Sequence, residues 1–179
     1  NLRVFGSCFL AFSDYMKPSI RLAAMMNLPV TYIFTHDSIL VGKDGATHEP
    51  VEQLAMLRTI PNLSVYRPGD HKELIGSWTE ILAKASPSAI ILPRGHVEVQ
   101  EFTNPAGIEY GGYIISEVKK SLDVILIATG SEVSYAMDLK EELMKNYIEA
   151  RVVSMPNIKN FLNQDKEYQN EVLPKGYKK

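Results

Sequence analysis

The sequence is poor in the features that mark secreted, membrane or nucleic-acid-binding proteins. It has one cysteine, Cys8, which cannot form an internal disulfide, and we therefore expect a reducing, cytoplasmic setting. The 19 lysines and arginines nearly balance the 21 aspartates and glutamates, which argues against a nucleic-acid or membrane partner. No apolar run is long enough to span a bilayer. The length of 179 residues suits one large domain or two small ones.

Several common catalytic and phosphate-binding signatures are missing as well. Gly42, Gly45 and Gly130 fit neither the dinucleotide fingerprint nor the P-loop pattern. No serine lies in a nucleophile elbow, and Cys8, in an apolar segment, is better explained as a small buried residue than as a nucleophile. The chain does not start with methionine, and it opens on apolar residues with no turn before them. We therefore expect it to begin partway through a larger polypeptide.

Short apolar segments of β type alternate with helical segments in the first half of the chain. Strands are expected at 29–34, 63–67 and 89–92, and helices at 13–27, 50–58 and 70–82. Ser13 or Asp14 would cap the first helix, Pro50 would lie in the first turn of the second, and Asp70 with Glu73 resembles a capping box for the third. This order predicts an α/β fold with a parallel sheet covered by helices.

The second half repeats the pattern on a smaller scale. A strand at 124–128, an amphipathic helix at 132–145 and a strand at 150–154 follow a possible edge strand or hairpin at 111–120. Residues 97–110 are polar and are interpreted as a linker, and residues 157–179 end without an obvious closing element. The prediction is therefore two α/β units, residues 1–96 and 111–179, joined by this linker.

One polar stretch, THDSILVGKDGATHEP at Thr35–Pro50, is the best candidate for a functional loop. It directly follows a predicted buried strand, and Arg94 follows another. In parallel sheets, ligands lie beyond the carboxyl ends of the strands, so both segments are expected at the same edge. The planar guanidinium of Arg94 is well suited to a phosphate.

The polar residues of this loop leave three interpretations open. His36, Asp44 and His48 could bind a metal, although no close histidine or cysteine pairing supports that. They could simply stabilise turns, since Asp44-Gly45 is a good turn dipeptide. They could also bind a substrate, because imidazole and carboxylate groups hydrogen-bond hydroxyls and imidazole moves protons near neutral pH.

Aromatic residues near the start of the chain form a second candidate group. Phe9, Phe12 and Tyr15 share one face if this stretch is helical, and packing in the core is the simplest interpretation.

Several motifs in order along the chain closely resemble the transketolase family. The motifs are Phe9–Phe12 (FLAF), Thr35–Ile39 (THDSI), Asp44–Pro50 (DGATHEP), Leu57–Asn62 (LRTIPN), Tyr66–Asp70 (YRPGD), Ala128–Val133 (ATGSEV) and Ala150–Pro156 (ARVVSMP). The block THDSI…DGATHEP is the most specific of them, because it distinguishes this family from other thiamine enzymes of similar fold.

The resemblance implies a transferase that uses thiamine pyrophosphate and Mg²⁺ to move a two-carbon ketol unit between sugar phosphates. It implies a homodimer whose active sites form between subunits, in carbohydrate metabolism through the pentose phosphate pathway. Residues 1–96 would be the later part of the pyrimidine-binding domain, and residues 111–179 the start of the C-terminal domain, so the chain would hold two incomplete Rossmann-like units. The family's metal and pyrophosphate motif would lie upstream, so metal ligands are expected outside this chain, and the chain alone is expected to be inactive.

The resemblance also implies roles for individual residues. Phe12, with Phe9 and Tyr15 around it, would pack against the aminopyrimidine ring of the cofactor. His36 and Arg94 would hold the sugar phosphate, Asp44 would accept a hydrogen bond from a substrate hydroxyl, and His48 would be the catalytic histidine beside the reacting oxygen, also touching the substrate.

The chain departs from the family pattern at a few places. Glu49 stands where the family usually has glutamine, Ala46 where it has proline, and Pro93-Arg94-Gly95-His96 where it has Ser-Arg-Gln-Asn. The alternative to an enzyme is a non-catalytic module that binds sugar phosphates or dimerises.

Overall fold

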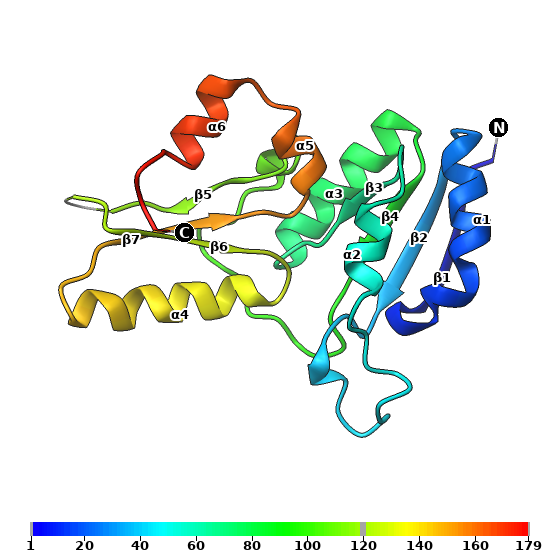
Figure 1. Ribbon diagram of the computed structural model, residues 1–179, viewed down its shortest axis with the longest axis horizontal. Helices are drawn as coiled ribbons and strands as arrows, with labels where there is room; N and C mark the ends of the chain where they lie inside the picture. Colours follow the sequence, from blue (N-terminus) through cyan, green and yellow to red (C-terminus); the bar gives the residue numbers. More distant parts are fainter. Residues whose placement is uncertain (1, 119–120, 179) are drawn as a thin grey trace. The chain divides into compact units, whose positions relative to one another are not determined.

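The chain folds into two α/β units. The computed structural model describes residues 2–118 and 121–178 (Figure 1). One unit consists of Asn1–Arg67 and Ser77–His96, and the other of Pro68–Gly76 and Val97–Lys179. No helix within these described ranges is long and apolar enough to cross a membrane.

The first unit is built on a four-stranded parallel sheet. Its strands are β1 (Val4–Phe9), β2 (Val30–Thr35), β3 (Ser64–Tyr66) and β4 (Ser88–Ile91), in the order β1-β2-β4-β3. Every neighbouring pair is parallel, as the alternation of strands and helices predicted. Parallel pairing brings the carboxyl ends of all four strands to one edge of the sheet.

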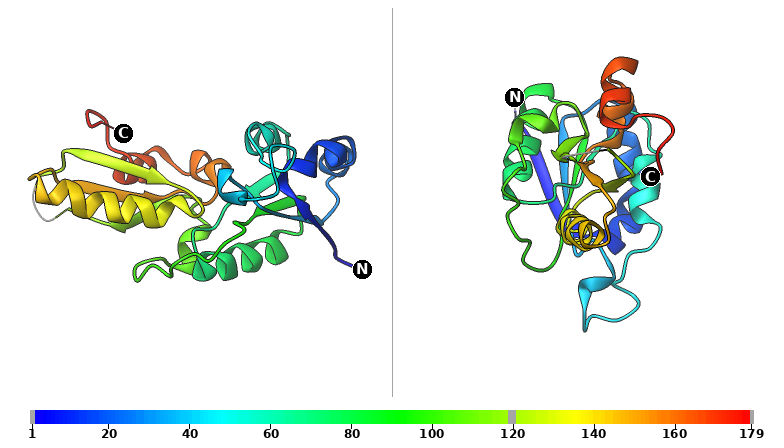
Figure 2. Two further views of the ribbon diagram at one scale, coloured as in Figure 1. Left: turned by 90° about the horizontal axis from the view of Figure 1, so that it is seen from below. Right: turned by 90° about the vertical axis from the view of Figure 1, so that its left-hand side faces the viewer.

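Helices cover both faces of this sheet. The left view of Figure 2 shows α1 (Ser13–Met25) and α2 (Gln53–Arg58) on one side of it and the later part of α3 (His71–Lys84) on the other. Apolar side chains from α1, α2 and the facing strand positions form one core, which includes Ile20, Phe34, Leu57 and Ile91, all fully buried. Burial on both faces explains why β2 and β4 have continuous apolar sequences rather than alternating ones.

The strand β1 was not predicted. The helical turn expected around Phe9 and Phe12 is confined to a 3₁₀ segment, η1 (Leu10–Phe12), and Val4–Phe9 pairs with β2 instead. All six residues of β1 are exposed or only half-buried, so the sequence lacks the buried apolar pattern of an inner strand. Pairing with β2 thus outweighs the conformational preference of the local sequence at Val4–Phe9.

Two helix starts also differ from the prediction. Ser13 is the first helical residue rather than a cap, and no hydrogen bond to its buried hydroxyl is found among the described residues. Helix α2 begins at Gln53, three residues after Pro50, because the Gln53 side chain accepts a hydrogen bond from the Val51 N–H and holds the preceding residues in a bend.

The second unit has a smaller, mixed sheet. Its strands are β5 (Tyr113–Ser116), β6 (Val124–Ala128) and β7 (Ala150–Ser154), in the order β5-β7-β6. Strands β6 and β7 are parallel, whereas the edge strand β5 is antiparallel to β7. Helix α4 (Glu132–Lys145) covers one face, and α5 (Ile158–Leu162) and α6 (Lys166–Val172) cover the other, as Figure 1 and the right view of Figure 2 show.

The helices α5 and α6 and the 3₁₀ turn η3 (Pro105–Ile108) lie in segments that were predicted to be irregular. Each begins with a side-chain cap, because Asn157, Asp165 and Asn104 accept hydrogen bonds from backbone N–H groups two or three residues later. Thr103 and Ile108, within residues 97–110, are buried in this unit.

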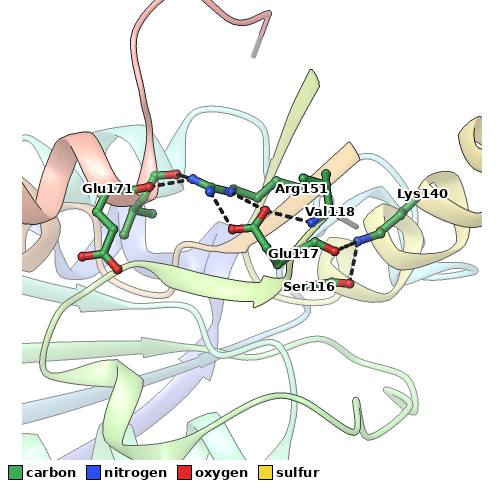
Figure 3. Close-up of polar contacts among 7 residues, drawn as sticks. Ser116, Glu117, Val118, Lys140, Arg151 and Glu171 are labelled. Carbon is green, nitrogen blue, oxygen red and sulfur yellow. Dashed lines mark hydrogen bonds and ion pairs between the residues drawn. The ribbon is translucent and has the colours of Figure 1, made fainter. Parts of the chain in front are cut away.

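A polar cluster at the edge of the second sheet joins four elements (Figure 3). The Arg151 guanidinium donates to both carboxylate oxygens of Glu117, with N···O distances of 3.1 and 2.6 Å. It also donates to the carbonyl of Glu171 at the end of α6, while Lys140 of α4 donates to Ser116 and to the Glu117 carbonyl. The bidentate pair joins β7 to the residue that follows β5, and the hydrogen bonds of Glu171 and Lys140 attach α6 and α4 to them.

The most deeply buried charge of the second unit is Glu73, which is completely inaccessible. Its carboxylate accepts hydrogen bonds from the Gly69 N–H at 2.6 Å, the Tyr113 hydroxyl at 2.7 Å and the Ser154 hydroxyl at 2.6 Å. Asp70 caps α3 as predicted, accepting from the Glu73 N–H at 3.0 Å. Burial raises the pKa of the Glu73 carboxyl, and these donors only partly offset it.

We predict that the titration of Glu73 lowers the stability of the chain as the pH rises. Its pKa in the folded chain lies above the ordinary value of 4.5, so between the two values the folded state binds more protons than the unfolded state. Stability therefore falls as pH rises through the folded pKa. Glu73→Gln should flatten this part of the profile, measured by urea unfolding at several pH values. Glu167→Gln, at an exposed site on α6, serves as the control, and equal slopes for wild type and Glu73→Gln would contradict the prediction.

Candidate functional site

The segments singled out in the sequence do follow the carboxyl ends of two neighbouring strands. Strand β2 ends at Thr35, where the polar loop begins, and β4 ends at Ile91, three residues before Arg94. The two strands pair in parallel, with Phe34 opposite Ile91, and the Leu92 N–H donates to the Phe34 carbonyl at 2.8 Å. Both segments therefore leave the sheet at the same edge.

Two phenylalanines and two histidines form one cluster at this edge. The β1–β2 register pairs Phe9 with Thr35, which places Phe9 next to His36. The Phe9 ring stacks on the His36 imidazole with a centroid distance of 3.8 Å. The His48 imidazole meets both phenylalanines edge-on, 5.0 Å from Phe12 and 5.9 Å from Phe9. Residues 39 positions apart in the sequence thus share one site.

Tyr15 lies at the outer margin of this cluster. Its ring centroid is 6.0 Å from that of Phe12, and the residue is 84% exposed. Phe9 and Phe12 are half-buried and nearly parallel, with an angle of 11° between their rings. The three aromatic residues are therefore not simply core residues, since they present ring surface that the described chain leaves open.

The loop between the histidines is shaped by turns. Gly42 and Gly45 have φ angles of +85° and +82°, which glycine adopts without strain. The His48 N–H donates to the Gly45 carbonyl and closes a turn around Ala46-Thr47. The Thr47 hydroxyl lies 2.8 Å from His48 Nδ1 and restricts the imidazole further.

Asp44 and Arg94 meet on the other side of the same loop. The Arg94 Nε lies 4.0 Å from Asp44 Oδ2, and a Cβ added at Gly42 would lie 3.5 Å from the Arg94 guanidinium. The side chains of Arg94 and Asp44 are 51% and 34% exposed, so the pair is weak and its groups can turn to an incoming ligand. The structure brings Arg94 to the predicted loop, in contact with its Asp44 end.

A hydrogen-bond chain fastens the end of the loop to the aromatic cluster. The buried Gln53 donates from Nε2 to Asp14 Oδ2 at 2.9 Å and accepts from the Val51 N–H at 2.9 Å. Asp14 is the second residue of α1 and directly follows the Phe12-Ser13 corner. This contact ties the segment after His48 to the helix start beside Phe12.

A buried ion pair that was not predicted from the sequence lies at this edge. Asp37 follows His36, and its Oδ2 atom accepts from Arg67 Nε at 2.8 Å and lies 2.7 Å from Arg67 Nη2. Arg67 directly follows β3, and Arg94 lies three residues after the end of β4. The expectation that ligand-binding residues follow the carboxyl ends of parallel strands, which singled out Arg94, applies equally to Arg67.

The site therefore combines groups of complementary chemistry. Two imidazoles can donate or accept hydrogen bonds and transfer protons, a guanidinium can bind an anion, and a carboxylate can accept from a hydroxyl. Among the described residues there is no group of three or more histidine, cysteine, aspartate or glutamate side chains that could hold a metal.

Comparison with known proteins matches both units. The model of the transketolase pyrimidine-binding domain matches residues 1–100, and that of the transketolase-like C-terminal domain matches residues 111–179. A transketolase of Bacillus subtilis is 51% identical over 99% of this chain, which covers 27% of that protein.

Solved structures of transketolases also superpose on this chain. The transketolase of Pichia stipitis in complex with sedoheptulose-7-phosphate superposes with a TM-score of 0.91 at 38% identity, over 97% of this chain and 26% of that one. A split-gene transketolase described as an inactive β4 tetramer superposes with a TM-score of 0.72 at 28% identity, over 85% of this chain and 48% of that one.

The chain thus spans about a quarter of the length of the curated relative that it matches. The family models together cover nearly all of it, and the loop from Thr35 to Pro50 lies within the first. On this evidence the chain belongs to the transketolase family.

Proposed function

We propose that this chain forms part of the active site of a thiamine pyrophosphate-dependent transketolase, which moves a two-carbon ketol unit between sugar phosphates. The observation that carries the proposal is the cluster of Phe9, Phe12, His36 and His48 at the strand ends, next to the loop that Arg94 contacts. The transketolase family membership supports the reaction class. The proposal includes the pentose phosphate pathway, a homodimer and a cytoplasmic location, and no nucleic-acid or membrane partner.

The aromatic residues fit a flat heterocyclic ring. Phe9 and Phe12 offer parallel, half-buried faces, and Tyr15 extends this surface outward. We assign these three residues to the aminopyrimidine of the cofactor, because stacked aromatic surfaces are stabilised by ring packing. The cofactor, when bound, supplies the carbanion chemistry, and the residues of this chain hold and orient the reactants.

The polar residues are assigned to the sugar phosphate. His36 and Arg94 would bind its phosphate group, and Asp44 would accept a hydrogen bond from a hydroxyl near the reacting carbon. His48, edge-on to Phe9 and Phe12, would donate to the substrate oxygen as negative charge develops there. The ligands of Mg²⁺ are proposed to lie outside this chain, and the domains to be residues 1–96 and 111–179, joined by residues 97–110.

The chain of 179 residues alone should have no ketol-transfer activity when supplied with thiamine pyrophosphate and Mg²⁺. The physical reason is that the proposed site also needs the metal and pyrophosphate ligands that the family resemblance places outside this chain. A coupled assay of sugar-phosphate interconversion would measure it, with a complete transketolase as the positive control. Turnover above the background of a heat-denatured sample would contradict the prediction.

We predict that Arg94→Ala weakens binding of a pentose phosphate to the chain. Losing a hydrogen bond to a charged group costs about 1.5–3 kcal/mol, which corresponds to roughly 10- to 150-fold in affinity. Calorimetric titration would measure it, with the same pentose lacking its phosphate as the reference ligand. The control is Arg21→Ala, an exposed arginine on α1. Equal affinity of wild type and Arg94→Ala would remove the arginine from the site.

A second candidate function is a module that associates with itself. Leu2, Val4 and Phe5 are 91%, 58% and 68% exposed, and β1 is the outer strand of its sheet. Exposed apolar residues on an edge strand favour pairing with another chain. The description of the split-gene relative as an inactive β4 tetramer gives this candidate further support.

If this candidate is right, the chain should form dimers or larger oligomers, and Phe5→Glu should shift it toward monomer. The introduced carboxylate would have to be buried at the interface, which is unfavourable without a partner. Light scattering on size-exclusion fractions would measure the mass. Leu162→Glu, at a residue of α5 that is 62% exposed, is the matched control. A monomeric wild-type chain at all concentrations would exclude the candidate.

A further inference from the structure

The buried ion pair between Asp37 and Arg67 has no role in the assignments above. Its side chains are 0% and 6% exposed, and two guanidinium nitrogens lie 2.7 and 2.8 Å from the same carboxylate oxygen. A charge pair buried to this extent forms one rigid unit, because neither group can leave without exposing the other to an apolar interior. The position of Asp37 is therefore fixed relative to β3.

The pair spans the edge where the candidate site lies. In the order β1-β2-β4-β3, the strand β4 lies between β2, which precedes Asp37, and β3, which precedes Arg67. The contact consequently bridges across the carboxyl end of β4, from which the Arg94 segment departs. The ion pair therefore connects the segments that follow β2 and β3, on either side of the segment that follows β4.

The residue before Asp37 has an unusual backbone. His36 has a φ of +59°, in the left-handed region that residues with a Cβ enter at a cost. Such conformations persist when the surroundings determine them from both sides. On one side the imidazole stacks on Phe9 at 3.8 Å, and Nδ1 lies 3.0 Å from the Thr35 hydroxyl. On the other side the following residue is held by Arg67.

We propose that Asp37 and Arg67 are positioning residues, which hold the His36 imidazole in the orientation that binds the phosphate of the sugar. The ion pair fixes the backbone after His36, and Phe9 fixes the ring, so the imidazole is presented without having to be ordered by the ligand. A pre-ordered group binds better than a mobile one because less freedom is lost on binding. The inference rests on the proposed function for the nature of the ligand, whereas the orientation of His36 stands on geometry alone.

The test replaces the pair by apolar residues of similar volume, Asp37→Leu with Arg67→Met, in the polypeptide expressed at the full length of its gene. Such replacements of buried pairs often leave stability unchanged, so they separate positioning from folding. The readout is the ratio of kcat/KM for a sugar phosphate to that for the same sugar without phosphate. This ratio should fall about 10- to 100-fold, since a displacement of about 1 Å can cost that much. The value for the unphosphorylated sugar should stay the same.

A double-mutant comparison identifies the residue through which the pair acts. Adding His36→Ala to the double variant should cause no further fall in the ratio, because the imidazole has already lost its orientation. Glu117→Gln is the matched control, since it disrupts another arginine–carboxylate pair, in the second unit. An unchanged phosphate preference in the folded double variant, or a loss that adds fully to that of His36→Ala, would overturn the proposal.

Two further measurements keep the outcomes distinct. If the double variant does not fold, Arg67→Lys retains the charge but loses the two-pronged contact, and full retention of phosphate preference would then overturn the proposal. The His36 ring protons, which lie over Phe9, should carry a ring-current shift in NMR spectra that the variants lose. If the wild type treats both sugars alike, the substrate assignment fails, while an unchanged ring-current shift in the variants would independently overturn the positioning role.

Discussion

The parallel pairing of β2 with β4 is the contact on which the site depends. Two strands that run in the same direction must deliver their following loops to the same edge, and the register of Phe34 opposite Ile91 sets how far each loop starts from the other. The pairing of β1 with β2 adds the aromatic residues, because Phe9 stands opposite Thr35 and so beside the first histidine. The site is assembled by sheet register rather than by proximity in the sequence.

Much of this arrangement was accessible from the sequence. The apolar runs that became β2, β4 and β7 were recognisable because most of their residues are buried on both faces, and β6 was recognisable from its continuous apolar sequence although Ile127 is exposed. The amphipathic period of residues 132–145 predicted α4, and the capping pattern of Asp70 with Glu73 predicted the start of α3. The polar loop after β2 and Arg94 after β4 could be assigned to one edge as soon as the sheet was taken to be parallel.

The features that escaped prediction share a physical cause. The strand β1 has exposed faces and therefore carries no burial pattern, and α5 and α6 are too short to show a helical period. The stacking of Phe9 on His36 depends on the register between two strands, which spacing in the sequence does not encode. The strand-end rule points to Arg67, but the sequence does not show that its partner is Asp37, which lies 30 positions earlier and follows a different strand.

The second unit uses the same edge of its sheet in a different way. The carboxyl ends of β6 and β7 are where a unit of this kind would receive a ligand, but Gly69 packs against Val133 and the Gly130 carbonyl there, and Glu73 reaches Ser154 at the end of β7. A segment of the chain itself thus occupies the position, with a carboxylate in place of a bound anion.

The contacts of Glu73 also control the hydrogen–deuterium exchange rate of one backbone amide. The Gly69 N–H lies outside every helix and strand, yet its acceptor is a carboxylate that Tyr113 and Ser154 hold in place. Solvent reaches this amide only when the whole arrangement separates, so its hydrogen–deuterium exchange should be as slow as that of the central strand β7. A single loop amide would then report the opening free energy of the entire second unit.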